Sequence, residues 1–301
     1  MTLDPRHDPN RRPNLLHWIE YGALKTIALL SRHISPRLID GLSSALWCWI
    51  APRMRRHPRA DRNLAAAMPE LSADERHIIL NKMWDNLGRT TTEAFALSQI
   101  ADDPHAITFN FPDDVIAMMK SDQPAIFVGL HAGNWEIPAI AAERFGKPLM
   151  GVYQKIVNPL LDEMVRGLRQ RFYRGGLHAK GAETVTRIRR GISDGYSVAI
   201  MADLRDAHGE FVPFMGRDAR STVFPALLAR LHKVPIIAIR ALRVGVRQFR
   251  IDAIHIPLIQ DKDRKIEIRE NTLRIQKQFE VWIKQDPEQW MWGHNRWDTE
   301  G

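Results

Sequence analysis

The apolar run Ala125-Ile-Phe-Val-Gly-Leu130, followed at once by His131-Ala-Gly-Asn-Trp-Glu136, most constrains how this chain can fold. A short, continuous apolar run that ends at turn residues is typical of a strand buried in a parallel sheet. The turn that follows predicts the start of a helix, with Asn134 as its N-cap residue. His131 would then lie at the carboxyl end of a core strand and Glu136 in the first helical turn, where open α/β sheets hold their ligands.

Strands and helices alternate from about residue 122, which predicts an α/β fold with a mixed, mostly parallel sheet flanked by helices. The predicted strands are 125–130, 148–153, 197–203, 235–244 and 249–256. The predicted helices are 135–145, 159–172, 182–194, 222–232 and 266–285. Because only a short turn joins the last two strands, we expect that pair to be antiparallel.

We expect three segments: a disordered tail over 1–13, apolar and basic membrane-associating helices over 14–62, and an α/β domain over 63–301. Two apolar stretches, Leu15–Leu30 and Leu38–Ala51, precede Pro52–Arg62, which holds five arginines in eleven residues. Apolar helices followed by arginines are typical of anchors at the cytoplasmic face of a membrane. The first stretch is shorter than the roughly 20 apolar residues of a full span, which favours a helix in the interface or a weak, tilted span. A core helix pair with a solvated basic loop is the alternative.

The net charge of +8 predicts an acidic partner: nucleic acid, an anionic membrane or a phosphorylated substrate. The single cysteine, Cys48, excludes an internal disulfide framework and a multi-cysteine metal site, which fits a reducing compartment. The sequence has no His-Glu-x-x-His spacing and no recognised nucleic-acid motif. We therefore expect no metal, no cofactor and no nucleic-acid partner. The polar first thirteen residues resemble no secretory signal. Because the cysteine usage fits a reducing compartment, we expect the chain on the cytosolic side.

His131 and Glu136 are the first candidates for chemistry. A histidine held by a carboxylate can take a proton from a hydroxyl group, and Gly133 lets a substrate approach the backbone closely. The spacing alone is common. Its structural alternative is a histidine at the edge of the core and a glutamate stabilised by the helix dipole.

A basic run from Arg166 to Arg190 contains eight lysines and arginines and one acid. Arg169 and Arg171 lie in it at the end of a predicted helix, and guanidinium groups suit bidentate recognition of phosphate. The run is either a phosphate-binding surface or a solvated helix face.

Other candidates follow later predicted strands. Asp203 ends the strand 197–203, where it could orient an arginine, bind substrate or cap a turn. Ser221 and Thr222 precede the helix 222–232, whose amides would suit an anion or a thioester carbonyl; ordinary N-capping is the alternative. The aromatic segment Pro287–Trp297 is expected to pack on the sheet as structural cover.

Taken together, these residues give the chain a resemblance to the bacterial lipid A biosynthesis (late) acyltransferases of the lauroyl and myristoyl transferase type. That family lies within the glycerolipid acyltransferase superfamily, which is marked by His-x4-Asp/Glu. The resemblance covers nearly the whole chain, and Glu at position 136 favours the lipid A branch. It is carried, in order, by the apolar N-terminal segment, Arg62-Asn63-Leu64, Gly88-Arg89 with Glu93, His131–Glu136, Val152-Tyr153, Asn158-Pro159-Leu160, Arg169 and Arg171, Asp203, Phe211–Gly216 and Pro287–Trp297.

The resemblance implies transfer of a lauroyl-like chain from acyl carrier protein, or from a coenzyme A thioester, to a hydroxyl of a lipid A precursor. The acceptor would be a phosphorylated glycolipid, and the reaction would belong to lipopolysaccharide biosynthesis at the cytoplasmic face of the inner membrane. His131 would deprotonate the hydroxyl, Glu136 would hold the imidazolium, and no acyl-enzyme would form. The set expected to bind substrate or stabilise the oxyanion is Arg169, Arg171, Asp203, Asn134, Ser221 and Thr222.

The sequence departs from the family pattern at three points. Gln154 follows Tyr153 where arginine is common, Leu204-Arg205 follows Asp203 where a polar residue and an acid are usual, and the threonine-rich run is reduced to Ser221-Thr222. These departures leave open a superfamily acyltransferase acting on lysophosphatidate, an ornithine lipid or a glycolipid. A basic nucleic-acid-binding protein is the remote alternative.

Overall fold

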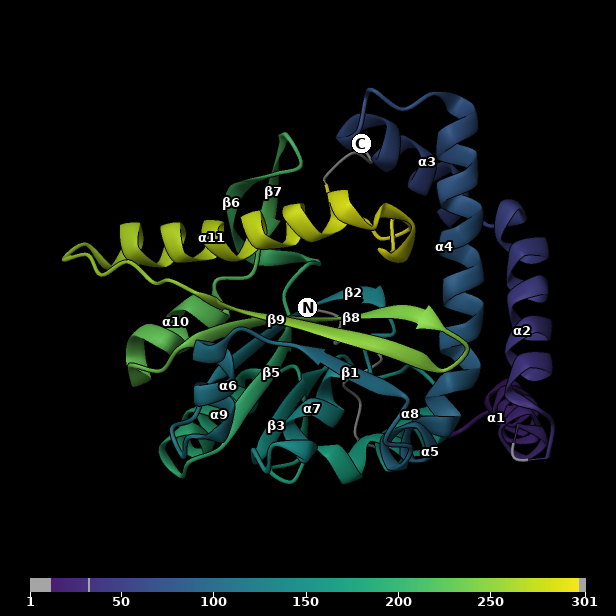
Figure 1. Cartoon of the computed structure of the whole chain (residues 1–301), viewed down its shortest axis with the longest axis horizontal. Helices are drawn as coiled ribbons and strands as arrows, with labels where there is room; N and C mark the ends of the chain where they lie inside the picture. Colours follow the sequence, from purple (N-terminus) through teal and green to yellow (C-terminus); the bar gives the residue numbers. More distant parts are fainter. Residues whose placement is uncertain (1–11, 32, 298–301) are drawn as a thin grey trace.

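A seven-stranded sheet with the order β1-β9-β8-β2-β5-β3-β4 forms the centre of the computed structural model, which describes residues 12–31 and 33–297 (Figure 1). All neighbouring strands run parallel except β8 and β9, which form an antiparallel hairpin. The strands are β1 Ile107–Asn110, β2 Ile126–Gly133, β3 Leu149–Tyr153, β4 Leu177–Ala179, β5 Ser197–Met201, β8 Ile236–Gly245 and β9 Gln248–Ile256. The prediction of a mixed, mostly parallel sheet is confirmed, including the antiparallel pair.

Helices cover both faces of this sheet because its central strands carry apolar residues on both sides. Ile126, Val128 and Leu130 of β2 belong to a core with α9, α10 and α11, whereas Phe127 belongs to a second core with α5, α6 and α7. The helices described are α1 Leu15–Leu30, α2 Pro36–Ile50, α3 Arg56–Ala67, α4 Ala73–Glu93, α5 Leu97–Asp102, α6 Asp113–Lys120, α7 Pro138–Arg144, α8 Pro159–Arg169, α9 Ala182–Ser193, α10 Phe224–His232 and α11 Arg264–Gln285.

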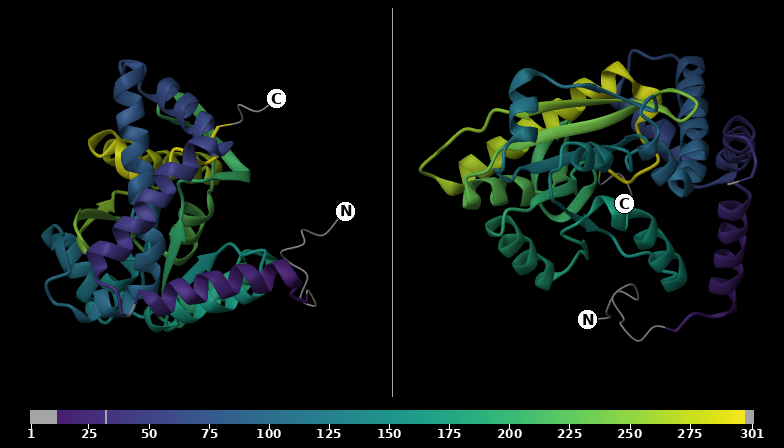
Figure 2. Two further views of the ribbon diagram at one scale, coloured as in Figure 1. Left: turned by 90° about the vertical axis from the view of Figure 1, so that its right-hand side faces the viewer. Right: turned by 60° about the horizontal axis from the view of Figure 1, so that its bottom comes forward.

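The N-terminal helices lie at one side of the molecule (Figures 1 and 2). Helix α2 runs along α4, and the two backbones approach so closely that a Cβ atom on Gly88 would lie 2.5 Å from the Cα atom of Ser44. Helix α1 is tied to the start of α8, because the side-chain amide of Asn158 donates to the carbonyl of His17 at 2.9 Å. The predicted boundary between residues 62 and 63 falls within α3.

Both N-terminal helices expose large apolar side chains. They are Leu15, Leu16, Trp18, Ile19, Leu29 and Leu30 on α1, and Leu38, Leu42, Leu46, Trp49 and Ile50 on α2. The α2 residues recur at helical spacing and so form one outward stripe. Within the described residues, no helix is both long and apolar enough to cross a bilayer.

Several predicted elements need correction. Helix α7 begins at Pro138 and not at 135, its N-cap position is Ile137, and Asn134 caps no helix. Strand β5 ends at Met201 and α10 begins at Phe224, each about two residues from the predicted bound. The strands β1 and β4, and the separate hairpin of β6 (Arg205–Phe214) and β7 (Arg217–Ser221), were not predicted. Residues 1–11 of the tail predicted to be disordered lie outside the described residues.

Candidate active site

The sheet register brings His131 and Asp203 together. Strands β2 and β5 are parallel neighbours in which Gly129 pairs with Met201, and the two candidates each follow two residues later. The imidazole Nδ1 of His131 lies 2.8 Å from Oδ1 of Asp203, and the peptide N–H of His131 donates to Oδ2 at 2.8 Å. The carboxyl ends of two core strands therefore hold an imidazole–carboxylate pair.

Asp203 is fully buried and accepts a further hydrogen bond from the indole Nε1 of Trp290 at 2.9 Å. Burial alone would raise the pKa of Asp203, but the charge of His131 and its two hydrogen bonds outweigh burial and hold that pKa well below its ordinary value. An ionised carboxylate can only accept hydrogen bonds, so Nδ1 of His131 carries the hydrogen. Nε2 is then the ring nitrogen able to take a proton.

Glu136 has a different partner from the one we expected. Its carboxylate receives two hydrogen bonds from Arg169, the last residue of α8, one of them from Nε at 2.7 Å. The imidazole of His131 is held by Asp203 instead. Burial would lower the pKa of Arg169, but the charge of Glu136 and its hydrogen bonds outweigh burial and raise that pKa, so the two residues form a half-buried, bidentate ion pair.

The turn between these pairs depends on a glycine. Gly133 has φ +56°, and a Cβ atom there would lie 1.8 Å from the carbonyl oxygen of Ala241. Asn134 is fully buried, and its Oδ1 accepts the peptide N–H of Glu136 at 3.0 Å. Asn134 thus shapes the backbone of the turn and does not line the cavity beside it.

A cavity of about 220 Å³ opens beside His131. Glu136 and Arg169 line it, as do Gln154 and Leu204, two of the positions at which the sequence departs from the family pattern. A larger hollow of about 830 Å³, between α10 and the loop before α11, contains none of the predicted site residues.

An apolar cavity of about 70 Å³ adjoins the first one and shares five lining residues with it. These are Trp135, Val152, Tyr173, Ile200 and Met201. It extends between β2 and α7 to Phe127, Ala139 and Leu149, so its wall is almost entirely hydrocarbon and aromatic. A cavity with charged side chains in its wall and an apolar cavity therefore meet beside His131.

Three predicted site residues lie elsewhere. Arg171 pairs with Asp102 and Glu143, and Ser221 is fully buried and accepts a hydrogen bond from Arg296 at 2.6 Å. Neither residue lines the cavity of His131. Thr222 lines an adjoining cavity of about 190 Å³, which shares five lining residues with that of His131, Lys180 and Leu204 among them.

His294 is a neighbour that sequence reasoning did not select. Its ring centroid lies 5.1 Å from that of His131. Burial, aided by the positive charge of His131, lowers the pKa of His294 to about 4, so its imidazole is neutral at pH 7. The predicted aromatic segment positions it, because Met291 donates its N–H to the carbonyl of His131 at 3.0 Å. Within residues 12–31 and 33–297, no group of three His, Cys, Asp or Glu side chains could hold a metal ion.

Comparison with known proteins decides the family. The sequence pattern of the family described as "Bacterial lipid A biosynthesis acyltransferase" matches residues 9–299. The chain belongs to this family. It is also similar to the protein named "Lipid A biosynthesis acyltransferase 2" of Shigella flexneri, with 21% identity over 287 residues that cover 92% of this chain and 88% of that protein.

As a member of this family, the protein is an acyltransferase that uses an acyl donor and a lipid acceptor. The predicted family, fold class and enzyme class are confirmed. The identities of donor and acceptor and the roles of individual residues stay predictions.

Proposed function

We propose that the protein transfers a fatty acyl chain from acyl carrier protein to a hydroxyl of a phosphorylated lipid A precursor, with His131 as general base. The observation that carries this proposal is the His131–Asp203 pair beside a cavity that has charged side chains in its wall and meets an apolar cavity. A hydroxyl needs a base, a thioester carbonyl needs a site for its developing charge, and an acyl chain needs an apolar wall.

The proposed reaction is a direct transfer. Nε2 of His131 takes the proton as the acceptor oxygen attacks the thioester carbon, and the buried charge of Asp203 stabilises the imidazolium. The tetrahedral intermediate collapses, the carbon–sulfur bond breaks, and the imidazolium returns the proton to the leaving thiolate. The products are an ester and a free thiol. No enzyme nucleophile takes part, so no acyl-enzyme forms.

Arg169 is the proposed cation of the site. It lines the cavity of His131, and its bidentate pair with Glu136 fixes its planar group. A guanidinium held in this way can stabilise the oxyanion or a phosphate of the acceptor without reorganising during the reaction. Glu136 in this scheme orients Arg169, which replaces the role of imidazole partner that we first assigned to it.

The apolar cavity is the proposed site of the acyl chain. Ala139 lines it from α7 and is almost fully buried. We expect Ala139→Leu to shorten the space and to shift the donor preference toward shorter chains, as measured by competition between acyl carrier proteins of defined chain length. An unchanged preference would place the chain elsewhere.

The membrane surface is the proposed location, at the cytoplasmic face of the inner membrane. The exposed apolar side chains of α1 and α2 and the following arginines, such as Arg53, Arg55 and Arg56, support this location. Apolar side chains would enter the interface while the arginines meet anionic headgroups.

The direct test incubates the purified enzyme with acyl carrier protein thioesters and a tetra-acylated lipid A precursor, followed by mass spectrometry of the lipid. We expect one added acyl chain with the wild type and a loss of about 10²–10⁴-fold in rate with His131→Ala. Unmodified precursor with the wild type, or full activity of the variant, would contradict the proposal.

A second acceptor class is favoured by one observation: Gln154 and Leu204 both line the cavity of His131. Because an enzyme selects its substrate through the contacts of its binding site, departures from the family pattern at residues that line the cavity favour a different acceptor. Lysophosphatidate, an ornithine lipid or a glycolipid would be the acceptor in that case. Lipid extracts of a deletion strain separate the two, because a missing lipid A chain supports our proposal and altered phospholipids or ornithine lipids support the second.

A further inference from the structure

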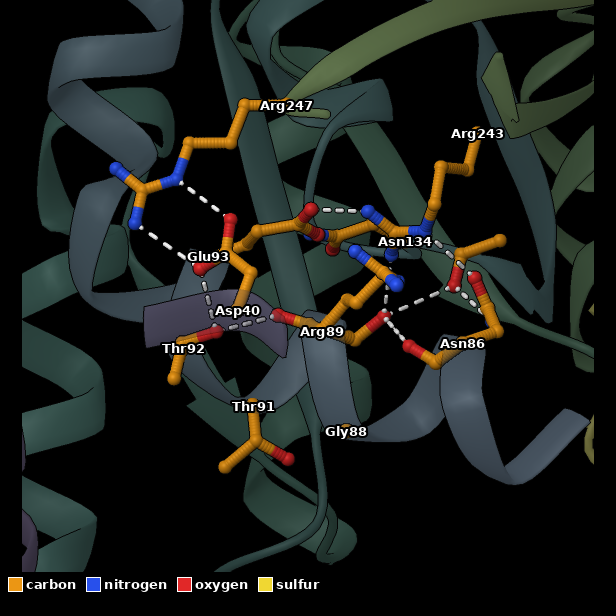
Figure 3. Close-up of polar contacts among 12 residues, drawn as sticks. Asp40, Asn86, Gly88, Arg89, Thr91, Thr92, Glu93, Asn134, Arg243 and Arg247 are labelled. Atoms are coloured by element: carbon orange, nitrogen blue, oxygen red, sulfur yellow. Dashed lines mark hydrogen bonds and ion pairs between the residues drawn. The ribbon is translucent and has the colours of Figure 1, made fainter. Parts of the chain in front are cut away.

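A cluster of buried and half-buried polar side chains contacts the turn that follows His131, and Figure 3 shows Asn86, Glu93, Asn134 and Arg243 of this cluster. Asn86, Thr90 and Glu93 come from α4, Arg243 from β8, and Asn134 from the turn itself. None of the five lines the cavity of His131, so the proposed reaction leaves their role unexplained.

One face of α4 holds the first half of the turn. Asn86, Thr90 and Glu93 are spaced four and three residues apart, so their side chains share a face of the helix. The amide of Asn86 donates to the carbonyl oxygen of Gly133 at 2.8 Å, and the hydroxyl of Thr90 lies 3.2 Å from the same oxygen. This carbonyl is therefore fixed two residues after His131.

Glu93 holds the second half of the turn through Asn134. The Nδ2 group of Asn134 donates to Oε2 of Glu93 at 2.9 Å, and its Oδ1 accepts the peptide N–H of Glu136 at 3.0 Å. A carboxylate can only accept, so Glu93 fixes which end of the Asn134 amide faces Glu136. Glu93 therefore sets the donor-to-acceptor direction of this series of hydrogen bonds.

Arg243 joins the two halves. Its guanidinium pairs with Glu93 and also donates to Oδ1 of Asn86 and to the hydroxyl of Thr90, each at 3.0 Å. Burial raises the pKa of Glu93, and the charge of Arg243 is the strongest influence in the opposite direction. The arginine thus favours the ionised carboxylate that the chain of hydrogen bonds needs.

We propose that Glu93 and Arg243 are positioning residues for acyl transfer, which act by fixing the amide of Asn134 and, through it, the peptide of Glu136. The backbone of Glu136 sets where its carboxylate meets Arg169 beside His131. The inference rests on the proposed function, since it assigns Glu93 and Arg243 to the geometry of that same reaction.

The test exchanges donor and acceptor. Glu93→Gln introduces an amide that can donate to Asn134, so the Asn134 amide can turn over and present its NH₂ group to the N–H of Glu136. Asn134→Asp sets two carboxylates against each other. In the double variant, the amide at position 93 donates to the carboxylate at position 134, whose other oxygen again accepts the N–H of Glu136.

We expect each single variant to lower kcat by about 10²-fold, with little change in KM, because a displaced catalytic group slows the reaction without weakening binding. The double variant should recover most of that loss. Single variants with wild-type kcat, or a double variant no better than the worse single one, would overturn the proposal.

Asp252→Asn is the matched control. Asp252 is a buried carboxylate on β9 that pairs with Arg240 and Arg250 and does not contact the turn. Asp252→Asn should lower the urea midpoint of unfolding, as we also expect for Glu93→Gln, while kcat stays at the wild-type value. An equal loss of kcat in Asp252→Asn would reduce the effect at Glu93 to general destabilisation and overturn the proposal.

Hydrogen exchange across residues 131–137 tests the positioning without any substrate. The single variants should exchange faster there than the wild type, and the double variant should be protected again. If the wild type transfers no acyl chain, the proposed function fails while this measurement still decides the positioning; unchanged exchange in the single variants would overturn it.

Discussion

Two hydrogen-bonded side-chain pairs, His131–Asp203 and Glu136–Arg169, hold the catalytic candidates beside the same cavity, and they are built in different ways. Asp203 is fully buried, accepts three hydrogen bonds, and meets His131 across two neighbouring strands. Glu136 lies in the turn after β2 and meets Arg169 at the end of a helix. The first pair is fixed by the sheet itself, whereas the second depends on how a turn and a helix end are held.

The difference shows that sequence distance is a poor guide to partnership. Glu136 lies five residues from His131, yet its carboxylate pairs with Arg169. The carboxylate that contacts the imidazole of His131 belongs to Asp203, seventy-two residues away in the sequence. Chain proximity brings residues near each other, but strand order and register decide which side chains meet. The comparison also ranks the two pairs by their expected effect on the rate. Loss of Asp203, which holds the general base His131, should slow transfer more than loss of Glu136, which holds the cation Arg169.

The largest expected effect is that of Asp203→Asn. An amide at position 203 can donate to Nδ1 of His131, which moves the ring hydrogen to Nε2 and removes the base; comparable changes in serine proteases cost about 10⁴-fold in kcat. Single-turnover rates measure it, with Asp252→Asn as the control for loss of a buried carboxylate. A smaller loss than that of Glu136→Gln would reverse our ranking of the two pairs.

The second prediction concerns the other pair. Arg169→Lys and Glu136→Gln should each lower kcat by about 10²–10³-fold, the usual cost of losing one preorganised donor at an oxyanion. A double-mutant cycle should give strong coupling between Glu136 and Arg169 and weak coupling between Glu136 and Asp203. The opposite pattern would restore Glu136 as the partner of His131.

The same contrast explains what the sequence could predict. The run 125–130 and the turn after it identify β2 and the position of His131, because a continuous apolar run before a glycine has few other uses. The hairpin of β8 and β9 was also predictable from two apolar strands joined by a short turn. By contrast, β4 has three half-buried residues, Leu177–Ala179, and such a short strand leaves no periodic signal.

Side-chain partners were harder to predict than strands. The pairing of Asp203 with His131 requires that β5 lie next to β2. The order of strands in a sheet cannot be predicted from the local pattern of apolar and polar residues. From the sequence, the hydroxyl of Ser221 before a helix was a candidate to bind substrate. In the structure it is buried and accepts a hydrogen bond from Arg296, which lies seventy-five residues later. The register in which Gly129 pairs with Met201 would have predicted the contact between Asp203 and His131 once the order of the strands was assumed.

The third prediction concerns the neutral histidine beside the first pair. Burial and the charge of His131 lower the pKa of His294 to about 4 from an ordinary value near 6.5. Between those values the unfolded chain takes up a proton that the folded protein does not, so acidification costs stability. Urea unfolding should show that His294→Gln loses about 2 kcal/mol less than the wild type between pH 7 and pH 5. An exposed histidine provides the control: His105→Gln should lose as much as the wild type.

The smallest expected effect separates the two arginines that the sequence grouped together. Arg171 lies two residues after Arg169, but it pairs with Asp102 and Glu143 and is 37% exposed. Arg171→Gln should therefore leave the transfer rate unchanged and lower the free energy of unfolding by at most about 1 kcal/mol, since exposed ion pairs contribute little. The rate assay and urea unfolding used for Arg169→Lys measure both quantities. A loss of transfer like that of Arg169→Lys would mean that the acceptor reaches beyond the cavity of His131 to Arg171. The Glu136–Arg169 pair would then be one part of a wider basic site.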